Sequence, residues 1–358
     1  MPLPCCNLKL VTPNCFSPLT PFSFYVKLRK SMKKSSENNT QWLALTYPAD
    51  SRPVADQIRA RRLQVNTQEW CKEFFANDIP NLEKVLIKLD TGLFSVLVYP
   101  GAKTEAAQFL SDFMAWWFLL DDRLECGHNK EQSTKKRHAL FRSYIASLQG
   151  SAAIGEIEDC FVLAARELGR RLPQFAGPAL CQRFCDSMKN WLFKGIEKEL
   201  AICGNPEKND VDSYFQIRPF SSGVLPTLYL GELASVQIPH GKAHNPLIDE
   251  FLEKAGRLIY LGNDIFSYHK EVDRPCNFNL AIILKREKAL SEKGALTECA
   301  RFHNEALCEY LELKARLKEL SVGAWLQGMD NVLTGLIEWQ MSAKRYQVEN
   351  CFWYWKDL

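Results

Sequence analysis

The sequence contains no run of 18 or more consecutive apolar residues, so we expect no membrane-spanning helix. Its most apolar stretch, Phe109–Leu120, is interrupted by Ser111 and Asp112. A large excess of one charge is also missing, because 45 basic and 42 acidic residues leave a net charge of +3. Proteins that bind nucleic acid by neutralising phosphates carry a broader basic surface than this balance provides. We therefore expect neither a membrane span nor a nucleic-acid partner.

Paired CxxC motifs are also absent, although the chain contains 13 cysteines. The count is odd, and no two cysteines are spaced with histidines in the way that structural zinc sites require. Scattered cysteines of this kind indicate reduced thiols in a cytosol-like compartment. A cytoplasmic location is the expectation.

Acidic residues are missing from the first 36 positions, which hold five lysines and one arginine among several Ser, Thr and Pro residues. This composition has the acid-poor bias of an organelle transit peptide. A plastid is therefore the alternative to a cytoplasmic location. The prolines, however, interrupt any amphipathic helix. A disordered basic extension over residues 1–40, or an upstream extension before an internal start at Met32, explains the same composition.

From about residue 53 onward, apolar residues recur every three or four positions, which predicts helices almost throughout. Turn residues separate the predicted helices. These helices span residues 133–149, 152–172, 177–201, 223–236, 246–271, 294–320 and 322–347. The short run Leu93–Tyr99 allows a strand, but one strand cannot form a sheet. No Gly/Ser linker divides the chain, so we predict one all-α, single-domain helical bundle over residues 45–358.

A first acidic cluster ends the apolar stretch, at Asp121, Asp122 and Glu125. Asp121 and Glu125 are four residues apart, so on a helix their carboxylates project from the same face. Adjacent like charges are unfavourable without a compensating cation, and carboxylate oxygens suit Mg²⁺ or Mn²⁺. A solvent-exposed helix end is the structural alternative.

A second constellation comprises Asn263, Ser267 and Glu271, which are spaced by one helical turn each. Their amide, hydroxyl and carboxylate oxygens form a column that can hold one Mg²⁺ and leave further positions for water or substrate. Lys270 lies near the same face, about two turns past Asn263. Alternatively, Asn263 is a helix N-cap and Glu271 a surface charge, but apolar residues directly before Asn263 indicate that the helix has already begun.

Together these motifs resemble the class I terpene synthases. Asn263, Ser267 and Glu271 fit the NDxxSxxxE metal motif of that family, and Asp121 to Glu125 resembles its aspartate-rich motif. Arg218 resembles the family's diphosphate-sensing arginine, and Arg345-Tyr346 its terminal RY pair. The likeness covers roughly residues 45–350 and is greatest to the single-domain cyclases of bacterial and fungal type.

The resemblance implies an isoprenoid-synthase helical bundle with a central cavity and three bound Mg²⁺ ions, Mn²⁺ being an alternative. It implies that farnesyl diphosphate is ionised and cyclised to a sesquiterpene. Arg218, Lys270, Arg345 and Tyr346 would bind the diphosphate, and Ser221 and Ser222 occupy the positions of a linker and an effector residue. Aromatic side chains near the motifs would line the cavity and attract carbocations, and ordinary core packing is their alternative role. The cavity candidates are Phe113, Trp117, Phe118, Ser222 and Trp339.

The sequence also departs from the family pattern. Glu125 replaces the more common aspartate, which leaves its metal contact open, and no DxDD string supports protonation-initiated cyclisation. Only one aspartate-rich motif is present, whereas chain-elongating prenyl transferases have two. A prenyl transferase remains an alternative function, as does a non-catalytic protein that binds isoprenoid diphosphates. The sequence does not decide whether the chain forms a homodimer.

Overall fold

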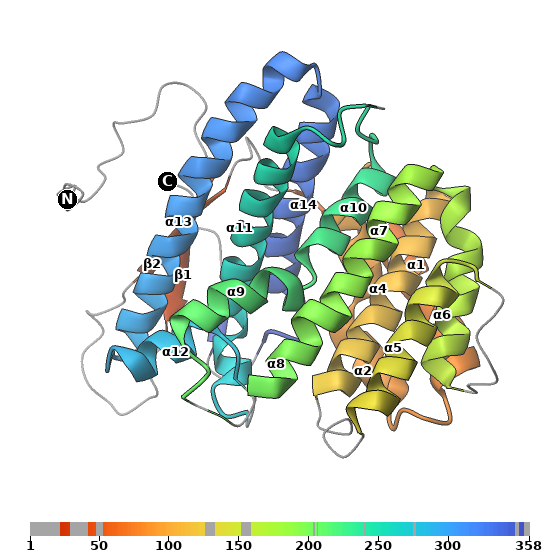
Figure 1. Cartoon of the computed structure of the whole chain (residues 1–358), viewed down its shortest axis with the longest axis horizontal. Coiled ribbons are helices and arrows are strands. Elements are labelled where there is room, and N and C mark those ends of the chain that lie inside the picture. Colours follow the sequence, from red (N-terminus) through yellow and green to blue (C-terminus); the bar gives the residue numbers. More distant parts are fainter. Residues whose placement is uncertain are drawn as a thin grey trace.

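The computed structural model describes residues 22–28, 42–47, 53–125, 133–151, 159–202, 205, 207–239, 241–274, 277–347 and 351–353. Most of these residues are helical (Figure 1). The helices in the first half of the chain are α1 (Gln57–Phe75), α2 (Leu82–Leu89), α3 (Thr91–Val98), α4 (Thr104–Glu125), α5 (Thr134–Leu148), α6 (Cys160–Arg171), the 3₁₀ turn η2 (Leu172–Gln174) and α7 (Pro178–Asn190). Those that follow are the π-helix η3 (Trp191–Ile196), α8 (Glu197–Ile202), α9 (Val211–Ser221), α10 (Val224–Ala234), α11 (Pro246–Glu271), α12 (Leu280–Glu287), α13 (Glu292–Leu317), the 3₁₀ turn η4 (Lys318–Leu320) and α14 (Gly323–Ser342).

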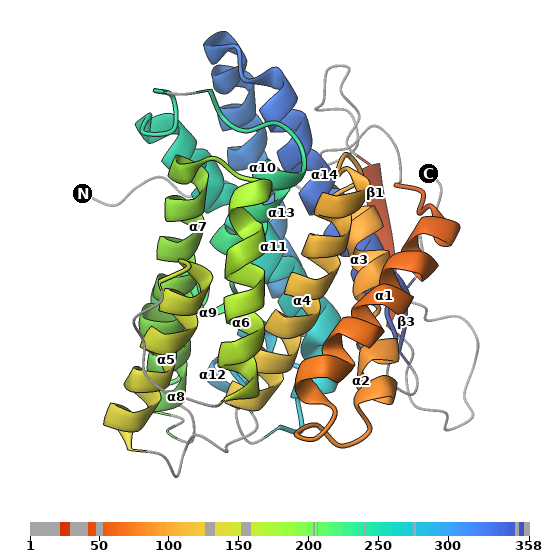
Figure 2. The ribbon, with the colours of Figure 1, turned by 90° about the vertical axis from the view of Figure 1, so that its right-hand side faces the viewer.

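The two helices that carry the acidic motifs, α4 and α11, are the framework of the bundle. The apolar stretch Phe109–Leu120 lies in α4 and is mostly buried, with Phe109, Leu110 and Leu120 each at most 1% exposed. Helix α11 packs against α13, and α10 contacts α4, α11 and α14. On the other side, α4 runs beside α1 and α6 (Figure 2). Helix α10 therefore bridges α4 and α11, whose motifs face one another.

The long helix predicted over residues 246–271 is confirmed at both ends. Pro246 occupies its first position, where a missing N–H costs nothing, and the Asn245 side chain accepts a hydrogen bond from the N–H of Leu247 at 2.9 Å. The helix predicted over 177–201 is continuous but changes type, because η3 is a π-helix between α7 and α8.

The strand that Leu93–Tyr99 allowed is wrong, because residues 91–98 form helix α3. The Asp90 carboxylate caps this helix by accepting a hydrogen bond from the N–H of Leu93 at 3.2 Å. Helix α3 contacts α1, α4 and α14, so nearly all of its side chains are buried. A helix that is covered on every side is apolar all round, and its sequence cannot be distinguished from a buried strand by periodicity.

The described residues also include three short strands, β1 (Phe22–Leu28), β2 (Trp42–Tyr47) and β3 (Cys351–Trp353). They form an antiparallel sheet in the order β2-β1-β3, and β2 contacts α13. Strand β1 lies inside residues 1–40, the segment expected to be a disordered extension. The helical bundle itself is all-α, as predicted.

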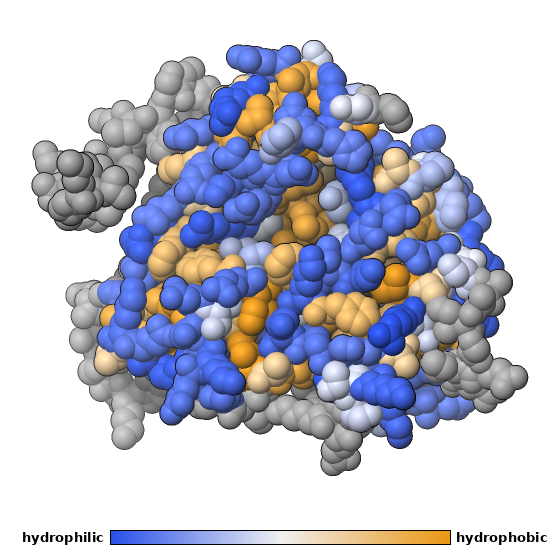
Figure 3. Space-filling view, in the orientation of Figure 1, coloured by the Kyte–Doolittle hydropathy of each residue, from blue (hydrophilic) through white to orange (hydrophobic). Residues whose placement is uncertain are grey.

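No helix in the described part of the chain is both long enough and apolar enough to cross a bilayer. Hydrophilic residues cover most of the face shown in Figure 3, with smaller hydrophobic areas between them. The six cysteines whose side chains the structure describes are free thiols.

Candidate active site

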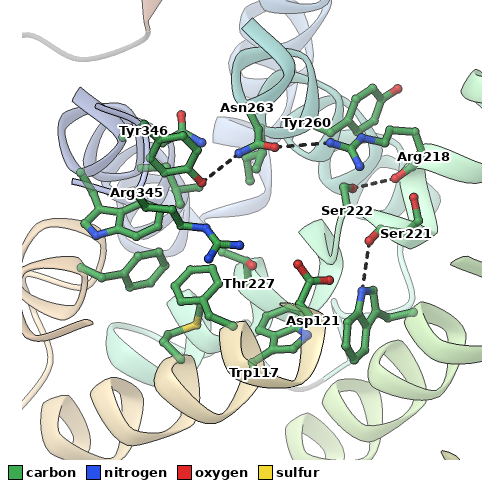
Figure 4. A pocket seen from close by; sticks show the side chains of 18 of the residues that line it. Trp117, Asp121, Arg218, Ser221, Ser222, Thr227, Tyr260, Asn263, Arg345 and Tyr346 are labelled. Atoms are coloured by element: carbon green, nitrogen blue, oxygen red, sulfur yellow. Dashed lines mark hydrogen bonds between the residues drawn. The ribbon is translucent and has the colours of Figure 1, made fainter. Parts of the chain in front are cut away.

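One pocket receives side chains from both acidic motifs. Asp121 of α4 and Asn263 and Glu271 of α11 line it together, and Arg218, Lys270 and Arg345 add three positive charges. Figure 4 shows the Asp121 carboxylate pointing into the pocket, with Asn263 on the opposite wall. Apolar and aromatic side chains from α3, α4, η3, α11 and α14 form most of the rest of the lining. The pocket thus has a polar wall of acids, amides and cations beside an apolar one.

Asp122 points to the RY pair. Arg345 donates two hydrogen bonds to its carboxylate, from Nη1 to Oδ2 and from Nη2 to Oδ1, both at 2.8 Å. Burial raises the pKa of Asp122, but the charge and hydrogen bonds of Arg345 outweigh this, so the pKa lies below its ordinary value. Asp122, predicted as a metal ligand, is therefore an ion-pair partner in this structure. The side chain of Glu125 lies outside the described residues.

The three residues of the second motif lie along α11 as their spacing predicted. Ser267 is fully buried, while Asn263 and Glu271 line the pocket. The side-chain nitrogen of Asn279, just before α12, lies 3.3 Å from Ser267 Oγ and 3.1 Å from Glu271 Oε2. Burial raises the pKa of Glu271, but the charges of Lys270 and Arg218 lower it below its ordinary value. Glu271 is thus held as a carboxylate.

Arg218 projects from α9 toward the start of the second motif. Its Nη2 donates to Asp264 Oδ1 at 2.6 Å and to Asn263 Oδ1 at 3.3 Å (Figure 4). Burial lowers the pKa of Arg218, but the Asp264 charge outweighs it and the pKa is well above its ordinary value. The Nε of Arg218 is buried and has no hydrogen-bond partner among the described residues. Buried donors are rarely left unpaired, so this nitrogen needs an acceptor.

A helix break follows Arg218. Ser222 is the C-cap of α9 and donates its hydroxyl to the Arg218 carbonyl at 2.7 Å, and both Ser221 and Ser222 line the pocket. Gly223 then adopts φ +69°, which connects α9 to α10. A Cβ at Gly223 would collide with Cζ2 of the Trp117 ring, so the break is packed directly against the pocket wall.

The C-terminal RY pair closes the polar end of the pocket. Asn263 Nδ2 donates to the Tyr346 hydroxyl at 3.2 Å, and Lys270 Nζ lies 5.7 Å from the centre of the Tyr346 ring. Burial raises the pKa of the Tyr346 phenol. Arg345 and Tyr346 therefore connect α4 and α11 across the pocket.

The aromatic wall contains most of the predicted residues. Trp117, Phe118 and Trp339 line the pocket, and Phe118 stacks on Trp339 with ring centres 5.3 Å apart and planes at 8°. The guanidinium of Arg345 lies 5.5 Å from the Phe118 ring centre.

Phe113 does not line the pocket, so this prediction is wrong. It is fully buried between Trp116, Trp117 and Phe184, about two turns before Asp121 on α4. Phe113 lies near the helical face of Asp121 but too far along α4 to reach the pocket. It therefore packs in the core behind the pocket wall.

Sequence reasoning missed several residues of the site. Asp264 is fully buried and accepts hydrogen bonds from Arg218, from the Tyr214 hydroxyl at 2.7 Å and from the N–H of Leu280 at 2.6 Å. Its position directly after Asn263 in the sequence could have indicated that it belongs to the site. Further lining residues that the motifs did not indicate include Trp191, Glu199 and Gln340, which lie on other helices, and Tyr260, which precedes Asn263 by one turn of α11.

The donor set fits a hard divalent cation. No group of three or more His, Cys, Asp or Glu side chains that could hold a metal occurs among the described residues, but the α11 face uses an amide and a hydroxyl beside its carboxylate. Ser267 Oγ and Glu271 Oε2 converge, because both lie within hydrogen-bond distance of one nitrogen, that of Asn279. All three side chains offer oxygen atoms, which is the ligand type that Mg²⁺ prefers.

The helical bundle and this pocket define the chain as a class I terpene synthase. Residues 112–309 match the model of terpene synthase family 2, C-terminal metal binding, so the chain belongs to this family. The family is a metal-binding one, which implies a divalent metal as cofactor.

Named relatives and solved structures agree with this assignment. Silphinene synthase peniA of Penicillium patulum is 23% identical over 296 residues, which cover 79% of this chain and 79% of that protein. The (+)-T-muurolol synthase of Roseiflexus castenholzii, described as (2E,6E)-farnesyl diphosphate cyclizing, is 26% identical over 269 residues, covering 72% and 81%. In fold, the chain is similar to 2-methylisoborneol synthase from Streptomyces coelicolor A3(2), solved with Mg²⁺ and 2-fluoroneryl diphosphate, with a TM-score of 0.73 at 18% identity over 84% of this chain and 96% of the other.

Proposed function

We propose that this terpene synthase ionises and cyclises farnesyl diphosphate to a sesquiterpene, with release of diphosphate. The observation that carries the proposal is the single pocket in which Asp121, Asn263 and Glu271 meet three cationic side chains beside an aromatic wall. The names of the relatives, a farnesyl diphosphate-cyclizing enzyme among them, support the fifteen-carbon substrate.

Asp121 would bind metal on the α4 side, with Glu125 assisting. Asn263, Ser267 and Glu271 would bind metal on the α11 side. We propose three Mg²⁺ ions, which Mn²⁺ can replace. When bound, they would neutralise the diphosphate and stabilise the charge that develops on it as the carbon–oxygen bond breaks.

The cationic side chains would complete the binding of the leaving group. The Nε–H of Arg218, which has no hydrogen-bond partner among the described residues, would donate a hydrogen bond to a diphosphate oxygen. Arg345 would turn part of its donor fork from Asp122 to the substrate, and Lys270 and the Tyr346 hydroxyl would donate from the α11 side. The electron pair of the broken bond leaves with the diphosphate, and an allylic cation remains in the pocket.

The aromatic wall would then control the cation. Trp117 and Trp339 are buried and Phe118 is partly buried. These side chains would exclude water that could react with the cation before the ring closes. Their ring faces also attract positive charge, by about 0.5–2 kcal/mol each. Ring closure followed by loss of a proton, or by capture of one water, completes the reaction.

Product analysis tests this function. Purified protein is incubated with the ten-, fifteen- and twenty-carbon diphosphates, with and without Mg²⁺, and products are identified by gas chromatography. We expect a cyclic fifteen-carbon product only with farnesyl diphosphate and Mg²⁺. A longer diphosphate formed only when isopentenyl diphosphate is added would instead indicate a prenyl transferase, and Mg²⁺-linked binding without product a non-catalytic protein.

The cytoplasmic location remains a proposal, with the plastid as its alternative. A fluorescent fusion to residues 1–40 separates them, because a transit peptide carries the fluorescence into the organelle. Sedimentation velocity distinguishes a homodimer from a monomer.

A further inference from the structure

Asn279 lies outside both metal motifs, yet its side chain contacts the motif on α11 at three positions. Its Nδ2 lies 3.1 Å from Glu271 Oε2, 3.3 Å from Ser267 Oγ and 2.8 Å from the backbone carbonyl oxygen of Asp264. Two of these groups are proposed metal ligands, and the third belongs to the residue after another ligand, Asn263. Asn279 is fully buried.

The orientation of this amide is fixed by a second function. Asn279 is the N-cap of α12, and its Oδ1 accepts a hydrogen bond from the N–H of Ala281 at 3.0 Å. Because the oxygen is held at the helix end, the nitrogen must face α11. The neighbouring Leu280 N–H donates to Asp264 Oδ2 at 2.6 Å, which attaches the start of α12 to the same helix.

We propose that Asn279 is a positioning residue for the α11 metal face. One N–H of its amide donates to the Asp264 carbonyl at 2.8 Å, and the other is shared between Glu271 Oε2 and Ser267 Oγ, so these two oxygens are held close together before a cation binds. Because these oxygens are already oriented, less conformational freedom is lost when the metal binds, and its affinity is higher. Hydrogen bonds to metal-binding side chains commonly act in this way. Asn279 does not bind the metal, because its oxygen is used by the helix cap. This inference rests on the proposed function.

The test separates positioning from capping. Asn279→Ser keeps an N-cap oxygen but loses the amide nitrogen. Asn245→Ser is the matched control, since Asn245 caps the far end of α11 through the same kind of bond, at 2.9 Å to the N–H of Leu247. That end lies about 25 Å along the helix from Asn263. Thermal unfolding in EDTA shows whether each variant remains folded.

Binding of inorganic diphosphate at increasing Mg²⁺ is then measured by calorimetry. We expect Asn279→Ser to need about 10- to 100-fold more Mg²⁺ for half-maximal binding, while Asn245→Ser behaves like the wild type. Equal Mg²⁺ dependence in all three proteins would overturn the inference, and tighter Mg²⁺ binding by Asn279→Ser would show that the amide competes with the metal. If the wild type itself shows no Mg²⁺-dependent binding, the proposed function fails instead.

Discussion

The contact between Gly223 and Trp117 allows a prediction whose size follows from the geometry. Gly223 has φ +69°, a conformation that costs a residue with a Cβ about 1–2 kcal/mol. An alanine Cβ would also overlap Cζ2 of Trp117 and lie 2.8 Å from its Cη2. The ring cannot withdraw freely, because it is 6% exposed and packs edge-on against Trp191 with centres 5.4 Å apart. Overpacking of this kind costs about 1–3 kcal/mol.

Gly223→Ala should therefore lower the free energy of unfolding by about 2–5 kcal/mol. Gly150→Ala provides the control, because Gly150 has φ +70° and no atom of the described residues lies within 4 Å of the added Cβ. It should lose only the conformational part, about 1–2 kcal/mol.

Urea unfolding followed by far-ultraviolet circular dichroism measures both losses, provided that the m-value is unchanged. In a Trp117→Leu background the smaller side chain relieves the overlap, so the cost of Gly223→Ala should fall to about that of Gly150→Ala. Equal destabilisation by the two glycine substitutions in the wild-type background would refute the reasoning, because it would mean that the ring yields without cost.

Further substitutions test the polar end of the pocket. Asn263→Ala and Glu271→Ala should each lower turnover by orders of magnitude with unchanged circular dichroism, and near-normal activity in both would remove the proposed metal face. Arg218→Lys loses the planar fork that suits phosphate oxygens, so kcat/KM should fall about 10- to 100-fold, the equivalent of one charged hydrogen bond; a value within twofold of the wild type would contradict the assignment. The lowered pKa of Asp122 means that its pair with Arg345 stabilises the fold above the ordinary carboxylate pKa and is lost as the pH falls through the lowered value. The unfolding free energies of the wild type and Asp122→Asn should therefore differ at pH 7 and converge as the pH falls through the lowered pKa of Asp122, and a difference that does not change with pH would argue against the ion pair.

The sequence by itself determined the helical architecture and the chemistry of the motifs. The period of the apolar residues and the end signals of α11 depend only on neighbouring residues, so its bounds were predictable. The one-turn spacing of Asn263, Ser267 and Glu271 also places three oxygens on one helical face wherever that helix lies.

Only the tertiary structure decided which side chains meet across helices. Asn279 reaches the α11 motif because α12 packs back onto α11, and Asp122 binds Arg345 because the chain after α14 returns to α4. The same packing placed Phe113 in the core and Trp117 in the wall, although both lie on one helix near the motif. Local periodicity gives the face of a helix, whereas the partner of that face depends on where every other helix lies, and no spacing along the chain contains this information.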